Sequence, residues 1–187
     1  MREVDCIVPD WPAPGQVRAL ATRRAGGVSE PPFDSLNLGL RSGDAVETVE
    51  ENRRRLTERL PAAPLWLRQQ HGIRVIDARD HGPDIEADGC VATRAGEVCA
   101  VLSADCLPLL LCDRAGTCVG AIHAGWRGLY AGIVASGVAA MQRPPGQLLA
   151  WLGPAISVEH YRVGGEFRER FLELDPALDA AFARRQD

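Results

Sequence analysis

The stretch 98-VCAVLSADCLPLLLCDRAGTCVGAIHAGWRGLYAGI-133 indicates the fold and carries the first candidate site. Its apolar runs predict three buried strands, near 98–103, 107–112 and 117–123. A helix rich in Ala and Gly is predicted at about 127–142. Cys106 and His123 are single reactive side chains at the ends of such runs. A thiol and an imidazole placed in this way can form part of a metal site, a nucleophile with its base, or core packing.

The flanking sequence extends this pattern to an α+β fold. Apolar residues spaced as on a helix face predict an amphipathic helix over 45–60, which Pro61 ends. Further strands are predicted at 16–27, 64–72, 73–78 (as hairpin partner of the preceding strand) and 148–156, with a polar, turn-rich stretch at 79–96 and mostly helix over 164–187. Because the strands do not alternate evenly with helices, α+β is favoured over a doubly wound α/β sheet.

Composition limits the class of protein. The 187 residues suit one domain, 1–187, and the net charge of −4 gives no global reason to expect nucleic acid as a partner. No apolar run approaches the roughly 20 residues of a membrane span, and the N-terminus carries charges where a signal peptide would be apolar. We therefore expect a cytoplasmic protein with no membrane association, in which the six cysteines are reduced.

Histidines and cysteines supply a candidate metal site. His71 and His123 each end an apolar strand next to glycine, and Cys106 joins them from a third segment. Two imidazoles and one thiolate fill three positions of tetrahedral zinc, and an open fourth position is typical of catalytic zinc. The spacing alone leaves two alternatives open: ordinary core residues, or a Cys106–His123 nucleophile pair. His81 and His160 do not end buried strands, so we do not expect them to be ligands.

Four further polar residues are candidates for catalysis or substrate binding. Arg24 precedes a glycine turn, and Arg127 lies at the predicted start of a glycine-bracketed helix. Guanidinium groups beside such backbone amides suit phosphate or another anion, although both arginines can also be surface charges. Asp105 can act as a general base, as a partner of a ligand, or as a turn cap. Asn37 can contact substrate or form a turn.

The motifs TRRAGGVSEPPFDSLNLGLRSGD, QQHG, ADGCVAT, LSADCLPLLLCD, GAIHAGWRGLYAGI and WLGPAIS occur in this order. Over about residues 16–167 the chain resembles the laccase-domain family, also called YfiH/YlmD-like, polyphenol oxidase or peptidoglycan editing factor. The resemblance implies an α+β fold of the CNF-toxin/YfiH-like, cysteine-hydrolase type, with mixed or antiparallel sheets flanked by helices. It places a zinc site at His71, Cys106 and His123. The family continues beyond the equivalent of residue 187, so we expect 1–187 to lack a C-terminal segment.

The resemblance also implies an activity: phosphorolysis of adenosine, inosine, guanosine and methylthioadenosine with phosphate, together with adenosine deamination. Catalytic roles are expected for Cys106, His123 and Asp105, in a monomer or homodimer. The older label, copper-dependent phenol oxidase, does not fit four histidines and two methionines, which are too few for a multicopper cluster. Copper can nevertheless bind opportunistically at a His2Cys site.

Two other functions stay open at this point. One is a cysteine-dependent amide hydrolase acting on a peptidoglycan precursor, with Cys106 as nucleophile and His123 or His71 as base. The other is a non-enzymatic metal-binding module.

Overall fold

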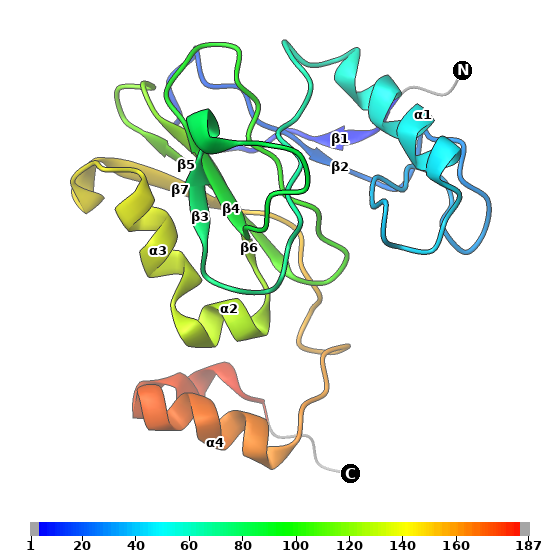
Figure 1. Ribbon diagram of the computed structural model, residues 1–187. Helices are drawn as coiled ribbons and strands as arrows, with labels where there is room; N and C mark the ends of the chain where they lie inside the picture. Colours follow the sequence, from blue (N-terminus) through cyan, green and yellow to red (C-terminus); the bar gives the residue numbers. More distant parts are fainter. Residues whose placement is uncertain (1–3, 184–187) are drawn as a thin grey trace.

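A mixed five-stranded sheet forms the centre of the computed structural model, which describes residues 4–183 (Figure 1). The strand order is β3-β4-β6-β5-β7. The strands are β3 (Val75–Asp77), β4 (Gly89–Ala92), β6 (Val119–Ala124), β5 (Leu107–Asp113) and β7 (Leu148–Leu152). β3 pairs with β4 in parallel, and the other pairs are antiparallel. The predicted α+β class with a mixed sheet and helices is confirmed.

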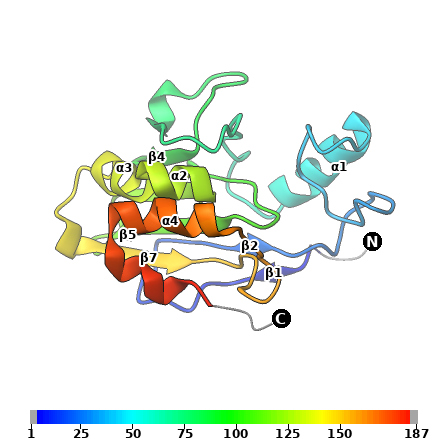
Figure 2. The ribbon, with the colours of Figure 1, turned by 90° about the horizontal axis from the view of Figure 1, so that it is seen from below.

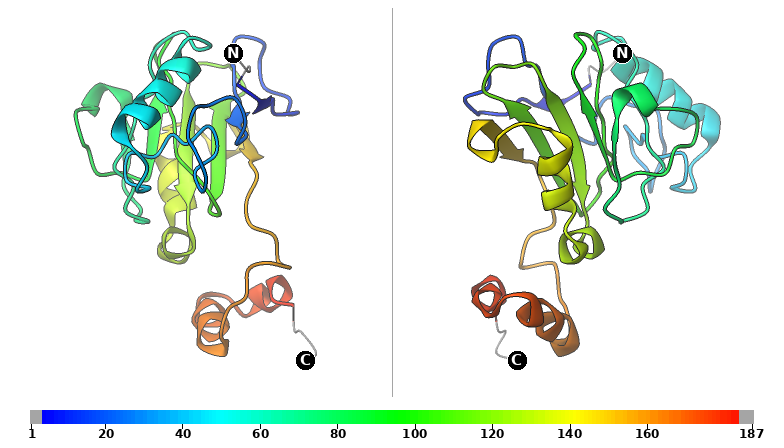
Figure 3. Two further views of the ribbon diagram at one scale, coloured as in Figure 1. Left: turned by 90° about the vertical axis from the view of Figure 1, so that its right-hand side faces the viewer. Right: turned by 60° about the vertical axis from the view of Figure 1, so that its left-hand side comes forward.

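Helices and a small second sheet surround this centre. The helices are α1 (Val46–Thr57), α2 (Trp126–Ala131), α3 (Ile133–Ala140) and α4 (Gly165–Leu174), with short 3-10 turns η1 (Ala78–Asp80), η2 (Pro145–Gln147) and η3 (Pro176–Ala181). β1 (Cys6–Ile7) pairs with β2 (Ala21–Thr22). α4 stands apart from the sheet at the end of an extended linker (Figures 1 and 3). Seen from below, it lies beside α2 (Figure 2).

The main core lies between α3 and the sheet. Ile122 of β6, Ile133 of α3 and Met141 are fully buried in one cluster with apolar residues of β4 and β5. A Cβ on Gly137 would lie 3.0 Å from the Ile122 side chain, so glycine lets α3 approach β6 closely. This packing holds β6 rigidly, together with the functional side chain that it carries.

The strand predictions were wrong in several places. Residues 64–72 and 98–103 form no strand and contain only isolated bridges, such as that between Leu65 and Cys99, and the apolar side chains of 98–103 line a groove. β4 lies inside the stretch predicted to be turn-rich, because four buried residues between polar neighbours give too short a signal. Residues 73–78 are not the hairpin partner of 64–72, since β3 pairs with β4 instead.

The helix predictions were closer to the structure. The amphipathic helix is confirmed as α1, with Val49 and Leu56 buried. The single helix predicted at 127–142 is divided into α2 and α3 at Gly132, which adopts a left-handed conformation with φ 98°. Residues 164–187 contain α4 and η3, and 184–187 lie outside the described part of the chain. Within residues 4–183, no helix has the length and apolar character that crossing a membrane requires.

Candidate metal centre

Three predicted ligands converge at one end of the central sheet. One ligand atom from each of His71, Cys106 and His123 lies within 4.8 Å of the others, and residues 4–183 contain no other metal-competent cluster of this kind. The two imidazole rings meet edge to face, with centroids 4.7 Å apart. His123 is buried, whereas His71 is exposed. These three side chains could therefore hold one metal ion.

The β5–β6 pairing explains why two of them meet. Pro108 lies opposite His123 in the antiparallel register, and Leu107 lies opposite Ala124. Cys106 directly precedes β5, so the start of β5 and the end of β6 bring thiol and imidazole to the same edge. His71 arrives from a separate loop, where its backbone has φ 59°.

A buried carboxylate, Asp88, joins the two histidines. Its Oδ1 accepts hydrogen bonds from the His71 amide (2.8 Å) and from His123 Nδ1 (2.9 Å), and its Oδ2 accepts from the amides of Gly72 (2.8 Å) and Gln70 (3.1 Å). Asp88 is only 1% exposed. With Nδ1 of His123 held by Asp88, Nε2 is the nitrogen left to ligate a metal, as in carboxylate–histidine–metal arrangements.

Electrostatics keep Asp88 ionised. Burial by itself raises the pKa of this carboxyl group, but hydrogen bonds from His123 and the backbone amides outweigh burial and hold the pKa below its ordinary value. The sequence interpretation overlooked Asp88 and considered Asp105 as the partner instead. Asp105 is exposed, and its backbone oxygen accepts a hydrogen bond from Ile156. The signal for Asp88 was the motif ADG, an acid beside a buried Gly-Cys strand.

The Cys106 thiol is partly buried. Burial raises its pKa, and the negative charges of Asp105 and Asp88 raise it further. In the absence of a cation this sulfur is therefore a neutral thiol at neutral pH. A bound metal ion would favour the thiolate, which is the form that ligates.

Gly125 leaves the space in which the three ligands meet. A Cβ at this position would lie 2.7 Å from the His71 ring and 3.0 Å from Cys106 Sγ. A Cβ on Gly128 would lie 2.9 Å from the carbonyl oxygen of Gly72, so the start of α2 packs directly on the His71 turn. The glycines of HAGWRG thus permit close approach of backbone to the centre.

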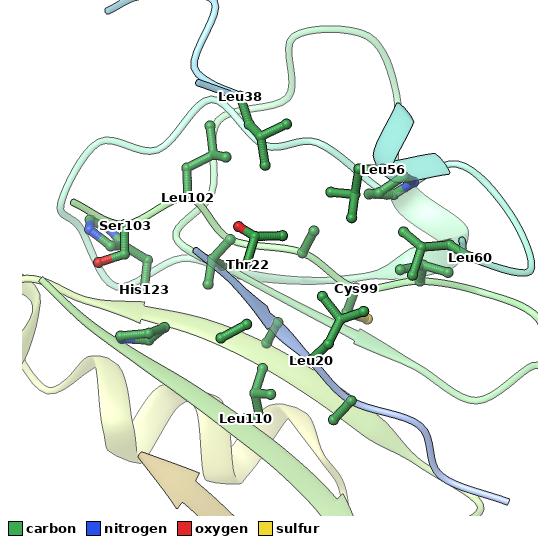
Figure 4. Close-up of a pocket in the computed structure, with 18 of the residues that line it drawn as sticks. Leu20, Thr22, Leu38, Leu56, Leu60, Cys99, Leu102, Ser103, Leu110 and His123 are labelled. Carbon is green, nitrogen blue, oxygen red and sulfur yellow. The ribbon is translucent and has the colours of Figure 1, made fainter. Parts of the chain in front are cut away.

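The centre opens into a groove of about 1760 Å³ between the main sheet, β2 and α1. Figure 4 shows His123 and Ser103 on one side of this groove and Leu60 and Cys99 on the other. Leucines supply much of the lining, namely Leu20, Leu38, Leu56, Leu60, Leu102 and Leu110. A wall of this kind suits a flat apolar ring better than a fully charged ligand.

Two of the predicted substrate-binding residues belong to this groove. Arg24 and Asn37 line it. The Arg24 guanidinium donates to the carbonyls of Asp34 (3.0 Å) and Pro32 (3.3 Å) and pairs with the Asp34 carboxylate (3.4 Å). The Asn37 amide is engaged in its own loop, donating to Ser42 at 2.6 Å and to Asp44 at 3.0 Å, which supports the turn-former alternative.

Arg127 is exposed, and its guanidinium stacks 4.6 Å from the centroid of the Trp126 ring. Tyr161 is within electrostatic reach of both Arg127 and Cys106: burial and Cys106 raise the pKa of its phenol, whereas Arg127 lowers it. His81 faces the carbonyl of Trp66 at 2.9 Å, and His160 is exposed. Neither histidine belongs to the ligand cluster.

Known proteins resemble the chain over nearly its whole length. The family described as multi-copper polyphenol oxidoreductase laccase matches residues 18–187. A purine nucleoside phosphorylase of Pseudomonas aeruginosa is 51% identical over 176 residues, which cover 94% of this chain and 72% of the relative. The purine nucleoside phosphorylase YfiH of Escherichia coli is 49% identical over 184 residues, covering 97% and 76% respectively.

Solved structures give the same assignment. A Neisseria meningitidis protein of the DUF152 family is 42% identical with a TM-score of 0.93, covering 98% of this chain and 76% of its own. The Bacillus licheniformis protein YfiH is 31% identical with a TM-score of 0.82, covering 91% and 71%. The chain therefore belongs to the laccase-domain family, that of the multi-copper polyphenol oxidoreductase laccase proteins and of the relatives named purine nucleoside phosphorylase YfiH.

Proposed function

We propose that the chain is a zinc-dependent purine nucleoside enzyme. Its reactions are phosphorolysis of adenosine, inosine, guanosine or methylthioadenosine, and deamination of adenosine. The observation that carries the proposal is the convergence of His71, Cys106 and His123 at one side of an apolar groove. The names of relatives about half identical in sequence support the same substrate class.

The donor set fits zinc. Zinc is a borderline-soft ion that binds imidazole and thiolate well, and three protein ligands leave one position open, as in catalytic zinc sites. Asp88 supplies the hydrogen bond that orients a ligating histidine. When bound, the metal would supply Lewis acidity to an oxygen placed at the open position. Copper can occupy the same ligands opportunistically. A multicopper oxidase is disfavoured because the chain has only four histidines, two of which lie outside the cluster.

In phosphorolysis, a phosphate oxygen bonds to the anomeric carbon of ribose while the bond from that carbon to the purine nitrogen breaks, and the electron pair leaves with the base. The leucine-rich wall would hold the purine and exclude water. Arg127 and Arg24 would offset the charge of phosphate. Asn37 would shape the loop that carries the Arg24 side of the groove.

In deamination, water adds to carbon 6 of adenine and ammonia departs. Asp105, which is exposed beside Cys106, is our candidate for accepting the water proton. Asp88 is unsuited to that task because both of its oxygens already accept hydrogen bonds from amides and from His123.

A second candidate function has one specific observation in its favour. Cys106, His123 and Asp88 supply a thiol, an imidazole and a carboxylate bound to that imidazole, which are the parts of a cysteine hydrolase. Such an enzyme of the cysteine-hydrolase type would cleave an amide, for example in a peptidoglycan precursor. The raised pKa of Cys106 argues against it, because a nucleophilic cysteine needs a lowered thiol pKa.

One experiment separates these functions. The metal content of the purified chain is measured, and base release from adenosine is then followed with and without phosphate. Zinc together with phosphate-dependent release supports the proposal. Metal-free protein whose amidase activity disappears on alkylation of Cys106 supports the hydrolase. Zinc without turnover indicates a non-enzymatic metal-binding module.

A further inference from the structure

Gln69, two residues before His71, makes two hydrogen bonds to the backbone of one distant residue. Its Nε2 donates to the carbonyl oxygen of Leu102 (2.8 Å), and its Oε1 accepts from the Leu102 amide (2.7 Å). We propose that Gln69 is a positioning residue of the metal centre, which holds the Cys106 segment at the separation from His71 and His123 that lets all three bind one ion. This inference rests on the proposed metal-dependent function.

Asp88 connects the two histidines to each other but does not connect either of them to Cys106. Asp88 accepts from the backbone of His71 and from the ring of His123, so these ligands are fixed relative to each other. Cys106 makes no hydrogen bond with Asp88 among the described contacts. The β5–β6 pairing ties Cys106 to His123 but not to His71, so the Cys106 segment needs a further connection to the His71 loop.

The side chain of Gln69 takes the place of a backbone pairing between two extended segments. Residues 65–69 run parallel to residues 98–102: Leu65 bridges to Cys99, and its amide donates to the Val98 carbonyl at 2.9 Å. The chain then turns towards the left-handed conformation of His71. The side-chain amide of Gln69 occupies both the donor and the acceptor of Leu102, as a neighbouring strand would do.

The connection from Leu102 to the thiol is short. Ser103 follows Leu102, and its hydroxyl donates to the carbonyl oxygen of Cys106, which closes the turn before β5. Figure 4 shows Ser103 and His123 on the same side of the groove. Loss of the Gln69 bonds would therefore release the stretch 102–106 from the residues before His71, while Asp88 still holds the two histidines together.

The test uses cobalt(II), which reports thiolate ligation through a sulfur-to-cobalt charge-transfer band. Gln69→Met keeps the length of the side chain and removes both hydrogen bonds. The control is Gln16→Met, which removes a comparable side-chain bond (2.9 Å) to Ala115, in the turn that joins the far ends of β5 and β6. We expect Gln69→Met to lose most of the charge-transfer band and about 10- to 100-fold in cobalt affinity. Gln16→Met should match the unmodified chain in both.

Three outcomes would overturn the inference. If Gln69→Met keeps the charge-transfer band and the cobalt affinity of the unmodified chain, then Gln69 contributes only to structure, whatever the melting temperature of the variant. Equal losses in Gln16→Met would show a general effect of stability. Failure of the unmodified chain to bind cobalt or zinc would remove the proposed metal function as well. If Gln69→Met does not fold, Gln69→Glu is measured instead, since it keeps the acceptor for the Leu102 amide and should give an intermediate band.

Discussion

His71 shows how strongly a single residue can depend on distant partners. A non-glycine residue with φ 59° carries a conformational cost, and the turn also directs three consecutive amides inward. Asp88 accepts hydrogen bonds from all three of these amides, at Gln70, His71 and Gly72. The carboxylate therefore offsets the cost of the turn and orients His123 at the same time.

We predict that Cys106→Ala and His123→Ala each lose bound metal and nucleoside activity while keeping the fold. Both changes remove a ligand atom from a partly open site and leave the α3–sheet core intact. Metal content, initial rate and circular dichroism of the purified variants check this. His81→Ala and His160→Ala are the controls and should keep the metal. Full metal and full rate in either ligand variant would contradict the assignment.

For Asp88 we predict that replacement by Asn weakens metal binding by about 10- to 100-fold. The neutral amide cannot accept from all the amides that now point at the carboxylate, and its NH2 group would face at least one of them. Competition with a chelator measures the affinity. Asp105→Asn is the matched control: its side chain is exposed, so the metal should stay while the turnover rate falls. Equal metal affinity in the two variants would count against a positioning role for Asp88.

Arg127→Ala is predicted to leave the metal bound and to raise KM for phosphate. Stacking on Trp126 uses the face of the guanidinium, so its N–H edge can meet an anion. Loss of a charge-assisted hydrogen bond of about 1.5–3 kcal/mol corresponds to roughly a tenfold to hundredfold rise. Arg127→Lys should recover little if the contact is bidentate. A lowered melting temperature with unchanged KM would mean that Arg127 only supports the turn into α2.

At the scale of elements, the β5–β6 hairpin was the most predictable part of the site. Its two apolar runs and intervening turn are local in sequence, so the pairing that brings Cys106 to His123 follows from them. β4 and the His71 loop were not predictable in the same way. β4 is only four residues long, and the His71 loop is held by Asp88, a residue 35 positions from its other partner, His123. A hydrogen bond of that range leaves no periodic pattern in the sequence.

The turn of the same hairpin leads to a prediction about pH. Burial by itself raises the pKa of Asp113, but hydrogen bonds from Thr117, the Cys118 amide and Arg143 outweigh it and hold the pKa below the ordinary 3.8. A lowered folded-state pKa contributes stability above the unfolded value of 3.8, and this contribution is lost as pH falls through the folded value. Asp113→Asn should therefore reduce the free energy of unfolding at neutral pH, by about 1.5–3 kcal/mol.

The difference between Asp113→Asn and the unmodified chain should shrink as pH is lowered stepwise below 3.8, since the native carboxylate is then neutralised as well. Urea unfolding followed by fluorescence at each pH measures it. Asp10→Asn, at an exposed carboxylate, is the control and should show little difference at any pH. If the difference in the free energy of unfolding does not change with pH, the loss in Asp113→Asn comes from packing and not from the charge of Asp113.

At the scale of the whole molecule, the chain has a packed body and a loosely attached arm. The body is the sheet with α3 and the groove, and its parts share buried clusters. The arm, α4 with η3, contains no buried residue and meets the body at α2 (Figure 2). The contact consists of edge-on aromatic pairs: Trp126 with Phe167 at 5.1 Å and Tyr130 with Phe171 at 5.5 Å.

Phe167 is central to that contact, because its ring also meets Tyr161, Phe171 and Phe182. Each aromatic pair contributes about 0.5–1.5 kcal/mol, so Phe167→Ala removes one of the two aromatic pairs between the arm and α2 and weakens the packing within the arm. We predict that amide hydrogen exchange over 165–174 becomes fast while β5 and β6 keep their protection, since the arm shares no buried cluster with the sheet. Leu174→Ala, 54% exposed on the same helix, is the control and should leave the exchange of α4 unchanged. If exchange accelerates equally in β5 and β6, the arm and body unfold as one cooperative unit, and the aromatic contact stabilises the metal centre as well as the arm.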